Sequence, residues 1–541
     1  MIKTCSLSPF VLPSRLTLAS AFGRSDLHTT NTHHTHASLK MSTDSTINGR
    51  TQQPMLASQR AKQQAQADEK PRSRGVSAYF PLGYKDAAYQ WWTSITPTAA
   101  ERSVLSFVPI LKEAAADGSA QTGSVTKNDP FGTREWRSTM VELSGKNRGL
   151  NEFSVERVGE QVDDTLVMLH GYGAGLGFFY KNFEPLSRIP GWKLYALDML
   201  GMGNSKRPDF KIRAKDPQAK ITEAENFFID ALEEWRKIRK IEKFTLLGHS
   251  LGGYLAVSYA LKYPGHLNKL ILASPVGIPE DPYAVNAAMP EPGESTMENE
   301  FTQGQESIVN PETNGDNNNF PGARNKKAAA ASNGTNNAGP RKKPLPGWLV
   351  WLWDANVSPF SFVRLTGPLG PRFVSGWSSR RFNHLPADEA QALHTYAYSL
   401  FRQKGSGEYS LPYILAPGAY ARSPVINRIQ DVGRQMIAPT AAGAPAVRET
   451  GIPVVMMYGD KDWMDVAGGY AAEEKLKQRI VKALLHGTDE EKRSENGSAK
   501  VVIIRKAGHH LYIDNPDEFN EVVASEMRET QAHGAKLRAL Q

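Results

Sequence analysis

The segment Gly248-His249-Ser250-Leu251-Gly252 is the feature that most constrains the fold of this chain. It follows a short apolar run, 244–247, and precedes an apolar stretch of helical character, 254–260. Small residues two positions before and after the serine allow a sharp strand-to-helix turn, and the helix behind it directs backbone N–H groups to the reacting centre. This context predicts a nucleophile elbow with Ser250 as the nucleophile, in preference to an ordinary glycine-rich turn.

Apolar runs along the chain indicate a sheet whose strands are buried on both faces. Short continuous runs without alternation are typical of parallel strands covered by helices. Two further strand signals, at 136–144 and 153–158, precede these runs. We therefore expect an α/β fold with a mostly parallel sheet flanked by helices. The expected parallel strands lie near residues 165–169, 192–199, 244–248, 270–273, 453–458 and 501–504.

Composition divides the chain into five parts. Asn, Gly, Pro, Ala and Glu dominate 281–343, which we expect to be a disordered insertion. The next part is apolar, aromatic and basic, and its run 348–353 suits an inserted helical cap over the active site. These rings can meet a lipid surface or pack between cap and core. The predicted parts are 1–75, a transit peptide and disordered segment; 76–280, the first half of the core; 281–343, the insertion; 344–435, the cap; and 436–541, the second half of the core.

The other catalytic groups are expected at the carboxyl ends of neighbouring strands, in the chain order nucleophile, acid, base. A loop that begins at His170 follows the run 165–169, and its backbone can face Ser250. We expect the N–H groups of Tyr172 and Leu251 to form the oxyanion hole.

The acid of the triad is expected in the loop after the strand at 453–458. Asp462 lies three residues past the glycine that ends this strand, in reach of an imidazole on the neighbouring strand. We favour Asp462 and keep Asp465 as the alternative acid. Asp460 is interpreted as a turn residue.

Four histidines compete for the role of general base. His509 follows an Ala-Gly turn at the end of the last strand, which suits a base that points back across the sheet edge. We interpret His510 as its packing or solvated neighbour. His249 precedes the nucleophile and His170 lies in the oxyanion loop, so structural roles are favoured for both.

With these residues in place, the chain resembles the lipid-acting branch of the α/β-hydrolases. This branch includes the animal ABHD4 and ABHD5 proteins, plant lysophospholipid acyltransferase-like hydrolases and the fungal mitochondrial cardiolipin-specific deacylase. The resemblance covers about residues 76–283 and 344–530 and implies an acyl hydrolase of glycerophospholipids that works without a metal or organic cofactor. It rests on 195–208, the elbow, 358–360 with 367–370, and 508–516.

The same resemblance implies a second activity. His509 and Asp514 match a His-x4-Asp pattern that this branch associates with transfer of an acyl group from acyl-CoA to lysophosphatidic acid. A helix-start interpretation competes with it, because Asn515 and Pro516 suit an N-cap and a first helical residue. We favour the helix start for Asp514 and keep the acyltransferase as the alternative function.

Charge and the first forty residues bear on where the chain acts. The formal net charge is +8, which suits an anionic membrane surface, and no nucleic-acid module is recognisable. Residues 1–40 are basic, poor in acids and rich in Ser and Thr, as in mitochondrial transit peptides. No apolar stretch is long enough to cross a membrane, so we expect peripheral binding. The cytosol or a lipid droplet is the alternative location.

The sequence thus predicts a serine acyl hydrolase of mitochondrial phospholipid remodelling, with cardiolipin as the expected substrate. The enzyme alternative is the lysophosphatidic acid acyltransferase. A lipid-binding lipase coactivator without catalysis is the third hypothesis, and the retained Ser250 argues against it.

Overall fold

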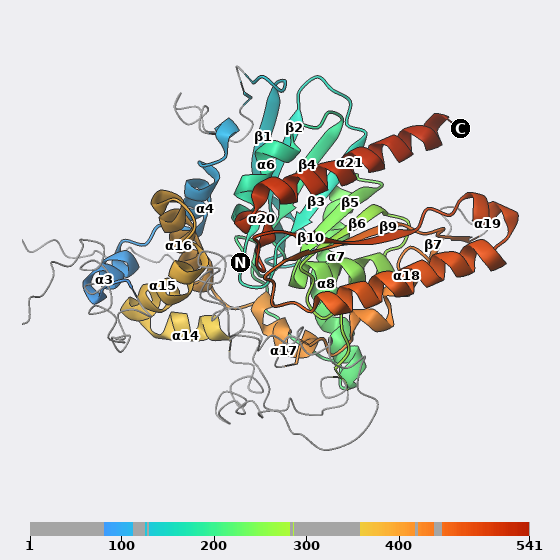
Figure 1. Ribbon diagram of the computed structural model, residues 1–541. Coiled ribbons are helices and arrows are strands. Elements are labelled where there is room, and N and C mark those ends of the chain that lie inside the picture. Colours follow the sequence, from blue (N-terminus) through green and yellow to red (C-terminus); the bar gives the residue numbers. More distant parts are fainter. Residues whose placement is uncertain are drawn as a thin grey trace, which may run out of the picture. The chain divides into compact units, whose positions relative to one another are not determined.

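An eight-stranded sheet forms the centre of the part of the chain that the computed structural model describes, residues 81–111, 125–126, 129–281, 285, 358–416, 420–437 and 446–539 (Figure 1). The strand order is β1-β2-β4-β3-β5-β6-β9-β10. The strands are β1 (Arg134–Glu142), β2 (Gly149–Arg157), β3 (Asp164–Leu169), β4 (Trp192–Leu197), β5 (Phe244–His249), β6 (Leu267–Ala273), β9 (Pro453–Gly459) and β10 (Ser498–Ile504).

Six neighbouring strands of the sheet, β4, β3, β5, β6, β9 and β10, are parallel to one another. Strands β1 and β2 lie at one edge, where β1 pairs with β2 and β2 pairs with β4 in antiparallel fashion. The predicted mostly parallel sheet is therefore confirmed. Parallel pairing brings the carboxyl ends of these strands to one edge of the sheet, where the loops of a ligand-binding site usually gather.

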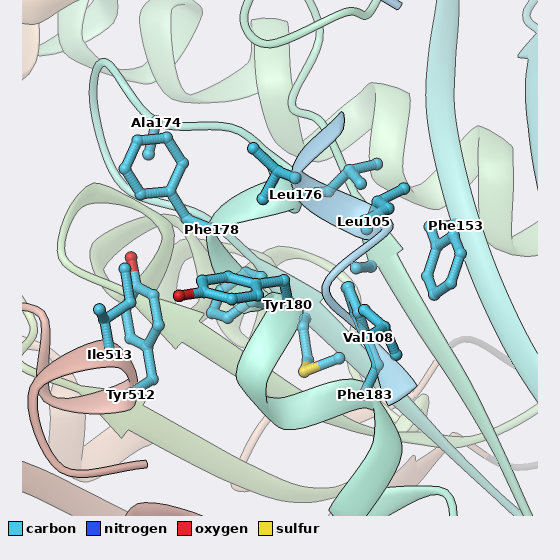
Figure 2. Close-up of a cluster of buried hydrophobic side chains, with 14 of the residues drawn as sticks. Leu105, Val108, Phe153, Ala174, Leu176, Phe178, Tyr180, Phe183, Tyr512 and Ile513 are labelled. Atoms are coloured by element: carbon cyan, nitrogen blue, oxygen red, sulfur yellow. The ribbon is translucent and has the colours of Figure 1, made fainter. Parts of the chain in front are cut away.

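Both faces of the sheet are buried, which explains the continuous apolar runs. Successive residues of a strand point to opposite faces, so Leu166 and Met168 join one hydrophobic cluster while Val167 and Leu169 join the other. Figure 2 shows part of the first cluster, where Leu105, Phe183 and Tyr512 come from three helices far apart in the sequence.

Helices cover each face. Helices α6 and α21 contribute to the first cluster, and α7, α8 and α18 contribute to the second. Local signals set the helix starts: the Asp216 side chain accepts a hydrogen bond from the backbone N–H of Ala219 at 2.8 Å, and Pro217 occupies the first turn of α7. These helices are α6 (Tyr180–Leu186), α7 (Pro217–Ile238), α8 (Leu251–Lys262), α18 (Val466–His486) and α21 (Pro516–Ala539).

A helical insertion lies between β6 and β9, and the expected fold class, including this inserted cap, is confirmed. Two N-terminal helices pack against the insertion (Figure 1), with Gln90 and His394 in contact at 3.1 Å. The sequence did not indicate this association. The inserted helices are α14 (Pro359–Leu365), α15 (Gly370–Arg381), α16 (Ala387–Phe401) and α17 (Leu411–Ile414), and the N-terminal ones are α3 (Tyr84–Trp92) and α4 (Pro97–Leu105).

Several sequence predictions lie outside the described residues. They are the leader and disordered segment 1–75, nearly all of the insertion 281–343 and the aromatic run 348–353. Among the helices that the structure does describe, none combines the length and apolarity needed to cross a membrane.

Candidate active site

Ser250 lies on a strained turn between β5 and α8. Its backbone has φ 53° and ψ −116°, a conformation that is rare for a residue with a side chain. A Cβ on Gly252 would lie 2.6 Å from the carbonyl oxygen of His170, and one on Gly248 would meet the carbonyl of Gly252. Both glycines are therefore required by close backbone approach, and the turn has the form of a nucleophile elbow.

The loop after β3 passes directly against Ser250. A Cβ on Gly171 would lie 3.0 Å from the Cβ of Ser250. Tyr172, the next residue, stacks its ring on Phe360 of α14 with centroids 5.2 Å apart. Leu251 is the first residue of α8. The two predicted oxyanion donors thus belong to the two segments that flank Ser250, and an inserted helix packs on one of them.

His509 follows β10 and is buried at the same edge of the sheet. Its Nδ1 lies 3.3 Å from Oδ1 of Asp462. Its Nε2, the atom that would take a proton from Ser250 if His509 is the base, has no hydrogen-bond partner within the described residues. Catalytic hydrogen bonds are often long or unformed without substrate, so this arrangement suits a base awaiting the reaction.

The two acids proposed from the sequence have different surroundings. Asp462 contacts His509 and accepts the Met464 N–H at 3.0 Å. Burial alone would raise the pKa of Asp462, but hydrogen bonds and the charge of His509 hold it below its usual value. Asp465 is the N-cap of α18 and accepts the Ala467 N–H at 2.9 Å. Asp460 accepts the Ala507 N–H at 3.1 Å, the contact of a turn residue.

The other histidines near the site have structural contacts. The Nε2–H of His249 donates to the carbonyl oxygen of His509 at 2.9 Å, and His510 contacts Arg381 of α15. Burial lowers the pKa of both His249 and His510 well below the usual value. Both rings are therefore neutral at pH 7, and they pack against His509.

Ser274 is a residue of the site that the sequence did not indicate. It directly follows β6, and its hydroxyl contacts both Asp462 and Nδ1 of His509, the latter at 2.7 Å. The sequence does show a polar residue directly after a buried strand. Its local sequence does not distinguish Ser274 from polar residues at the ends of other strands.

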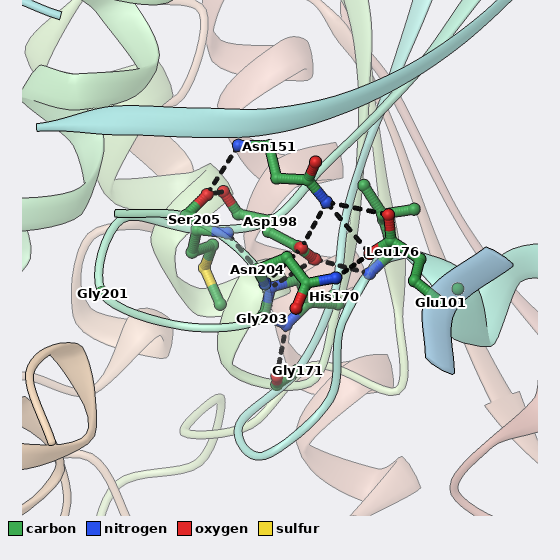
Figure 3. Close-up of polar contacts among 12 residues, drawn as sticks. Glu101, Asn151, His170, Gly171, Leu176, Asp198, Gly201, Gly203, Asn204 and Ser205 are labelled. Atoms are coloured by element: carbon green, nitrogen blue, oxygen red, sulfur yellow. Dashed lines mark hydrogen bonds and ion pairs between the residues drawn. The ribbon is translucent and has the colours of Figure 1, made fainter. Parts of the chain in front are cut away.

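A buried polar network supports the oxyanion loop from behind (Figure 3). Asp198, at the end of β4, accepts the Leu176 N–H at 2.6 Å, the Asn204 N–H at 2.7 Å and an amide N–H of Asn151 at 2.8 Å. Nδ1–H of His170 donates to the Gly171 carbonyl at 2.7 Å, while Nε2 accepts the Met199 N–H at 3.0 Å. These bonds fix both ends of the loop that carries Tyr172.

Glu101 and Tyr396 connect this network to α4 and α16. Glu101 accepts hydrogen bonds from Asn204 at 2.7 Å, from Asn151 at 3.0 Å and from the Tyr396 hydroxyl at 3.2 Å. Burial, and next the charge of Asp198, raise the pKa of Glu101 to about 8. Figure 3 shows the two carboxyl groups on either side of the Asn151 amide.

Glu101→Gln should therefore change how stability depends on pH. Between the ordinary pKa of 4.5 and the folded value of about 8, the unfolded chain has lost a proton that the folded chain keeps, so wild-type stability falls as pH rises. Glutamine does not titrate. We expect the Tm of the variant relative to wild type to increase from pH 5 to pH 8, measured by thermal unfolding. Glu490→Gln, at an exposed carboxyl, is the control, and a pH-independent difference for Glu101→Gln would contradict the assignment.

Asp514 is the last residue of a short helix, α20 (Leu511–Asp514), and is separated only by Asn515 from the start of α21 at Pro516. Its Oδ2 accepts the Gly508 N–H at 2.9 Å, and its Oδ1 lies 3.7 Å from Nε2 of His384. Asn515 accepts the Glu518 N–H at 3.4 Å and serves as the helix cap. Asp514 therefore braces the loop that presents His509. Among the described residues no group of His, Cys, Asp and Glu side chains could hold a metal ion.

The comparisons with known proteins agree with this geometry. Residues 164–315 match a sequence model of the alpha/beta hydrolase fold. The chain is 30% identical over 433 residues to a 1-acylglycerol-3-phosphate O-acyltransferase of Arabidopsis thaliana, covering 79% of this chain and 78% of that protein. It is 28% identical over 370 residues to the human (lyso)-N-acylphosphatidylethanolamine lipase, and the match covers 67% of this chain and 79% of that protein. Human 1-acylglycerol-3-phosphate O-acyltransferase ABHD5 is 27% identical over 363 residues, and the match covers 66% of this chain and 76% of that protein.

The chain belongs to the α/β-hydrolase family. Within that family it is an ABHD4- and ABHD5-like member of the lipid-acting branch, and the resemblance inferred from its sequence is confirmed. Its coarse activity follows: an enzyme of acyl hydrolysis or acyl transfer in lipid metabolism.

Proposed function

We propose that this protein is a serine acyl hydrolase that removes acyl chains from glycerophospholipids, with cardiolipin as the expected substrate. The observation that carries the proposal is the position of Asp462 and His509 at the sheet edge where the elbow presents Ser250. A lipid-binding coactivator needs neither an acid beside an imidazole nor a strained turn under a serine.

The proposed reaction is acyl transfer through the nucleophile. Ser250 Oγ attacks the ester carbonyl while Nε2 of His509 takes its proton, and the same nitrogen returns the proton to the leaving alcohol. Asp462 orients the imidazole, and the N–H groups of Tyr172 and Leu251 hold the oxyanion. Water then attacks the acyl-enzyme, with His509 again as the base.

An exposed apolar surface supports peripheral binding to a membrane. Helices α3 and α14 expose large side chains: 82% of Trp92 and 84% of Leu365 are accessible, and Tyr89 of α3 and Phe362 of α14 are also exposed. Amphipathic aromatic rings suit the lipid headgroup region, and the net charge of +8 favours anionic lipids. Phe360 of α14 contacts the oxyanion loop, so this surface and the active site share a helix.

Mitochondrial location is the part of the proposal that rests on composition alone. Residues 1–40 are basic, acid-poor and rich in hydroxyl side chains. A fluorescent fusion of this segment is expected to enter mitochondria. A cytosolic or lipid-droplet signal would leave the proposed chemistry in place and overturn the location.

Deacylation of vesicles of defined lipids tests the substrate class. We expect release of fatty acid from cardiolipin vesicles at a rate at least about tenfold above that from phosphatidylcholine, a difference of about 1.4 kcal/mol in transition-state binding. The Ser250→Ala protein provides the blank. Equal rates on both lipids would remove cardiolipin from the proposal, and no release from any phospholipid would remove the phospholipase.

Acyl transfer to lysophosphatidic acid is the second candidate. It is favoured by the activity for which the Arabidopsis thaliana relative is named and by the position of Asp514, whose carboxylate accepts a hydrogen bond from the loop that carries His509. An acyl-enzyme can be discharged by a lipid hydroxyl as well as by water, so acyl-CoA is the donor to examine.

Asp514→Asn separates the two candidates. Asparagine keeps an oxygen that can accept the Gly508 N–H, so a hydrolase should lose about 1 kcal/mol of stability or less and retain phospholipid deacylation. A transferase that uses the carboxylate would lose transfer from acyl-CoA while hydrolysis persisted. Both activities are measured with radiolabelled donors on one preparation. Robust wild-type transfer that disappears in the variant would replace the hydrolase by the acyltransferase.

A further inference from the structure

Ser274 occupies a constrained position between the acid and the base. It is fully buried, and its φ of 47° places it in the left-handed region that few side-chain residues adopt. Its backbone N–H donates to the Met457 carbonyl at 2.7 Å, which ties it to the end of β9. The backbone therefore holds the hydroxyl in one place at the carboxyl edge of the sheet.

The direction of the hydrogen bonds at Ser274 follows from the number of protons. A serine hydroxyl has one donor, and an ionised carboxylate only accepts, so the Ser274 O–H donates to Oδ2 of Asp462. The Ser274 oxygen then accepts Nδ1–H of His509 at 2.7 Å. The direct contact of Nδ1 with Asp462 is longer, 3.3 Å, and lies beyond the usual range for such a bond.

We propose that Ser274 is a positioning residue of the catalytic centre, which links Asp462 to His509 and holds the imidazole in the orientation that the reaction needs. Nδ1–H is then held by Ser274, so Nε2 is the nitrogen free to take a proton. The proposal rests on the proposed function, because it assigns Ser274 a part in the acyl chemistry of Ser250.

Contacts around the imidazole support this role. Trp463 lies on the ring of His509 with centroids 5.0 Å apart, and His249 packs against it with centroids 4.8 Å apart. These rings confine the imidazole plane, but neither forms a hydrogen bond with Nδ1 of His509. The acceptors are the Ser274 hydroxyl and Asp462, and the hydroxyl is the nearer.

Loss of the Ser274 hydroxyl should affect the chemical step, and therefore kcat, more than substrate binding. During attack the imidazole becomes an imidazolium, and a hydrogen bond from a charged donor is stronger than one from a neutral donor. Loss of the Ser274 hydroxyl should therefore weaken the transition state more than it weakens substrate binding. It should also disfavour the protonated base, so the acidic limb of the profile of kcat/KM against pH should move to lower pH.

Ser274→Ala and Ser274→Gly test the proposal on a soluble short-chain ester, which removes membrane binding from the measurement. We expect kcat to fall about 10- to 100-fold in both, KM to stay within about twofold, and the acidic limb to move down by about 0.5 to 1 pH unit. Glycine adopts the left-handed conformation freely, whereas alanine does not, so equal losses assign the effect to the hydroxyl. Ser258→Ala, which removes another buried hydroxyl in α8, is the control.

A double-mutant cycle adds a readout that a structural role would not move. In the Asp462→Asn background, where the carboxylate is gone, Ser274→Ala should cost at most about threefold in kcat. Full additivity of the two losses would overturn the link between Ser274 and Asp462. Wild-type kcat and an unmoved acidic limb in both Ser274 variants would overturn the proposal, as would a loss confined to alanine.

Failure of the proposed function gives a different result. Wild-type protein that neither cleaves the ester nor reacts with a fluorophosphonate at Ser250 would remove the serine hydrolase itself. If the wild type is active and labelled but the Ser274 variants keep wild-type kcat and an unchanged acidic limb, only the role of Ser274 is removed.

Discussion

Ser250→Ala should abolish ester hydrolysis, with a loss of about 10⁴-fold or more in kcat. The hydroxyl is the nucleophile of the proposed acyl-enzyme, and loss of such a group leaves only the part of catalysis that comes from the oxyanion hole and binding. The fold should survive, because the elbow is held by backbone contacts: the Ser250 N–H donates to Ala273 at 3.0 Å, and its carbonyl accepts from Tyr254 at 3.2 Å.

A fluorophosphonate probe measures this prediction directly. It should label the wild type and leave Ser250→Ala unlabelled, with equal Tm values and equal binding to anionic vesicles for the two proteins. Labelling of both proteins would place the reactive group elsewhere. An unlabelled wild type that still binds lipid would favour the coactivator hypothesis.

Asp462→Asn should lower kcat by about 10³- to 10⁴-fold, because an amide cannot hold the imidazole in the required orientation or stabilise its protonated form. Asp465→Asn is the matched control. Asparagine is also a good N-cap, so this variant should keep helix α18 and remain within a few fold of wild-type kcat. Both are measured at saturating substrate. The reverse ranking would move the acid to Asp465.

Local patterns were enough to predict the sheet and the elbow. Continuous apolar runs mark strands buried on both faces, and glycines two residues from Ser250 mark a turn too tight for a Cβ. The order of the strands and the rule that parallel strands share a carboxyl edge then place the loops of Tyr172, Asp462 and His509 together.

Other features could not be read from local patterns. Helix α4 contributes Leu105 to the first hydrophobic cluster, and both α3 and α4 also pack on the inserted helices. The second contact was not predictable, since an amphipathic helix does not specify which surface it covers. Asp514 lies next to the start of α21, and the hydrogen bond that its carboxylate accepts from the Gly508 N–H was not indicated by the sequence. In both cases the local sequence is compatible with more than one packing partner, and only the tertiary structure selects the partner.

The sequence by itself determined the fold class and the strand ends that carry the predicted nucleophile, acid and base, because these follow from periodicity, turn chemistry and chain order. It indicated the family through its resemblance to known proteins. Only the tertiary structure decided which polar groups support them. Ser274 meets His509 across 235 residues, and Glu101 meets Tyr396 across 295. Such contacts depend on how buried hydrogen-bonding groups find partners once the chain is packed, and no local pattern encodes that choice.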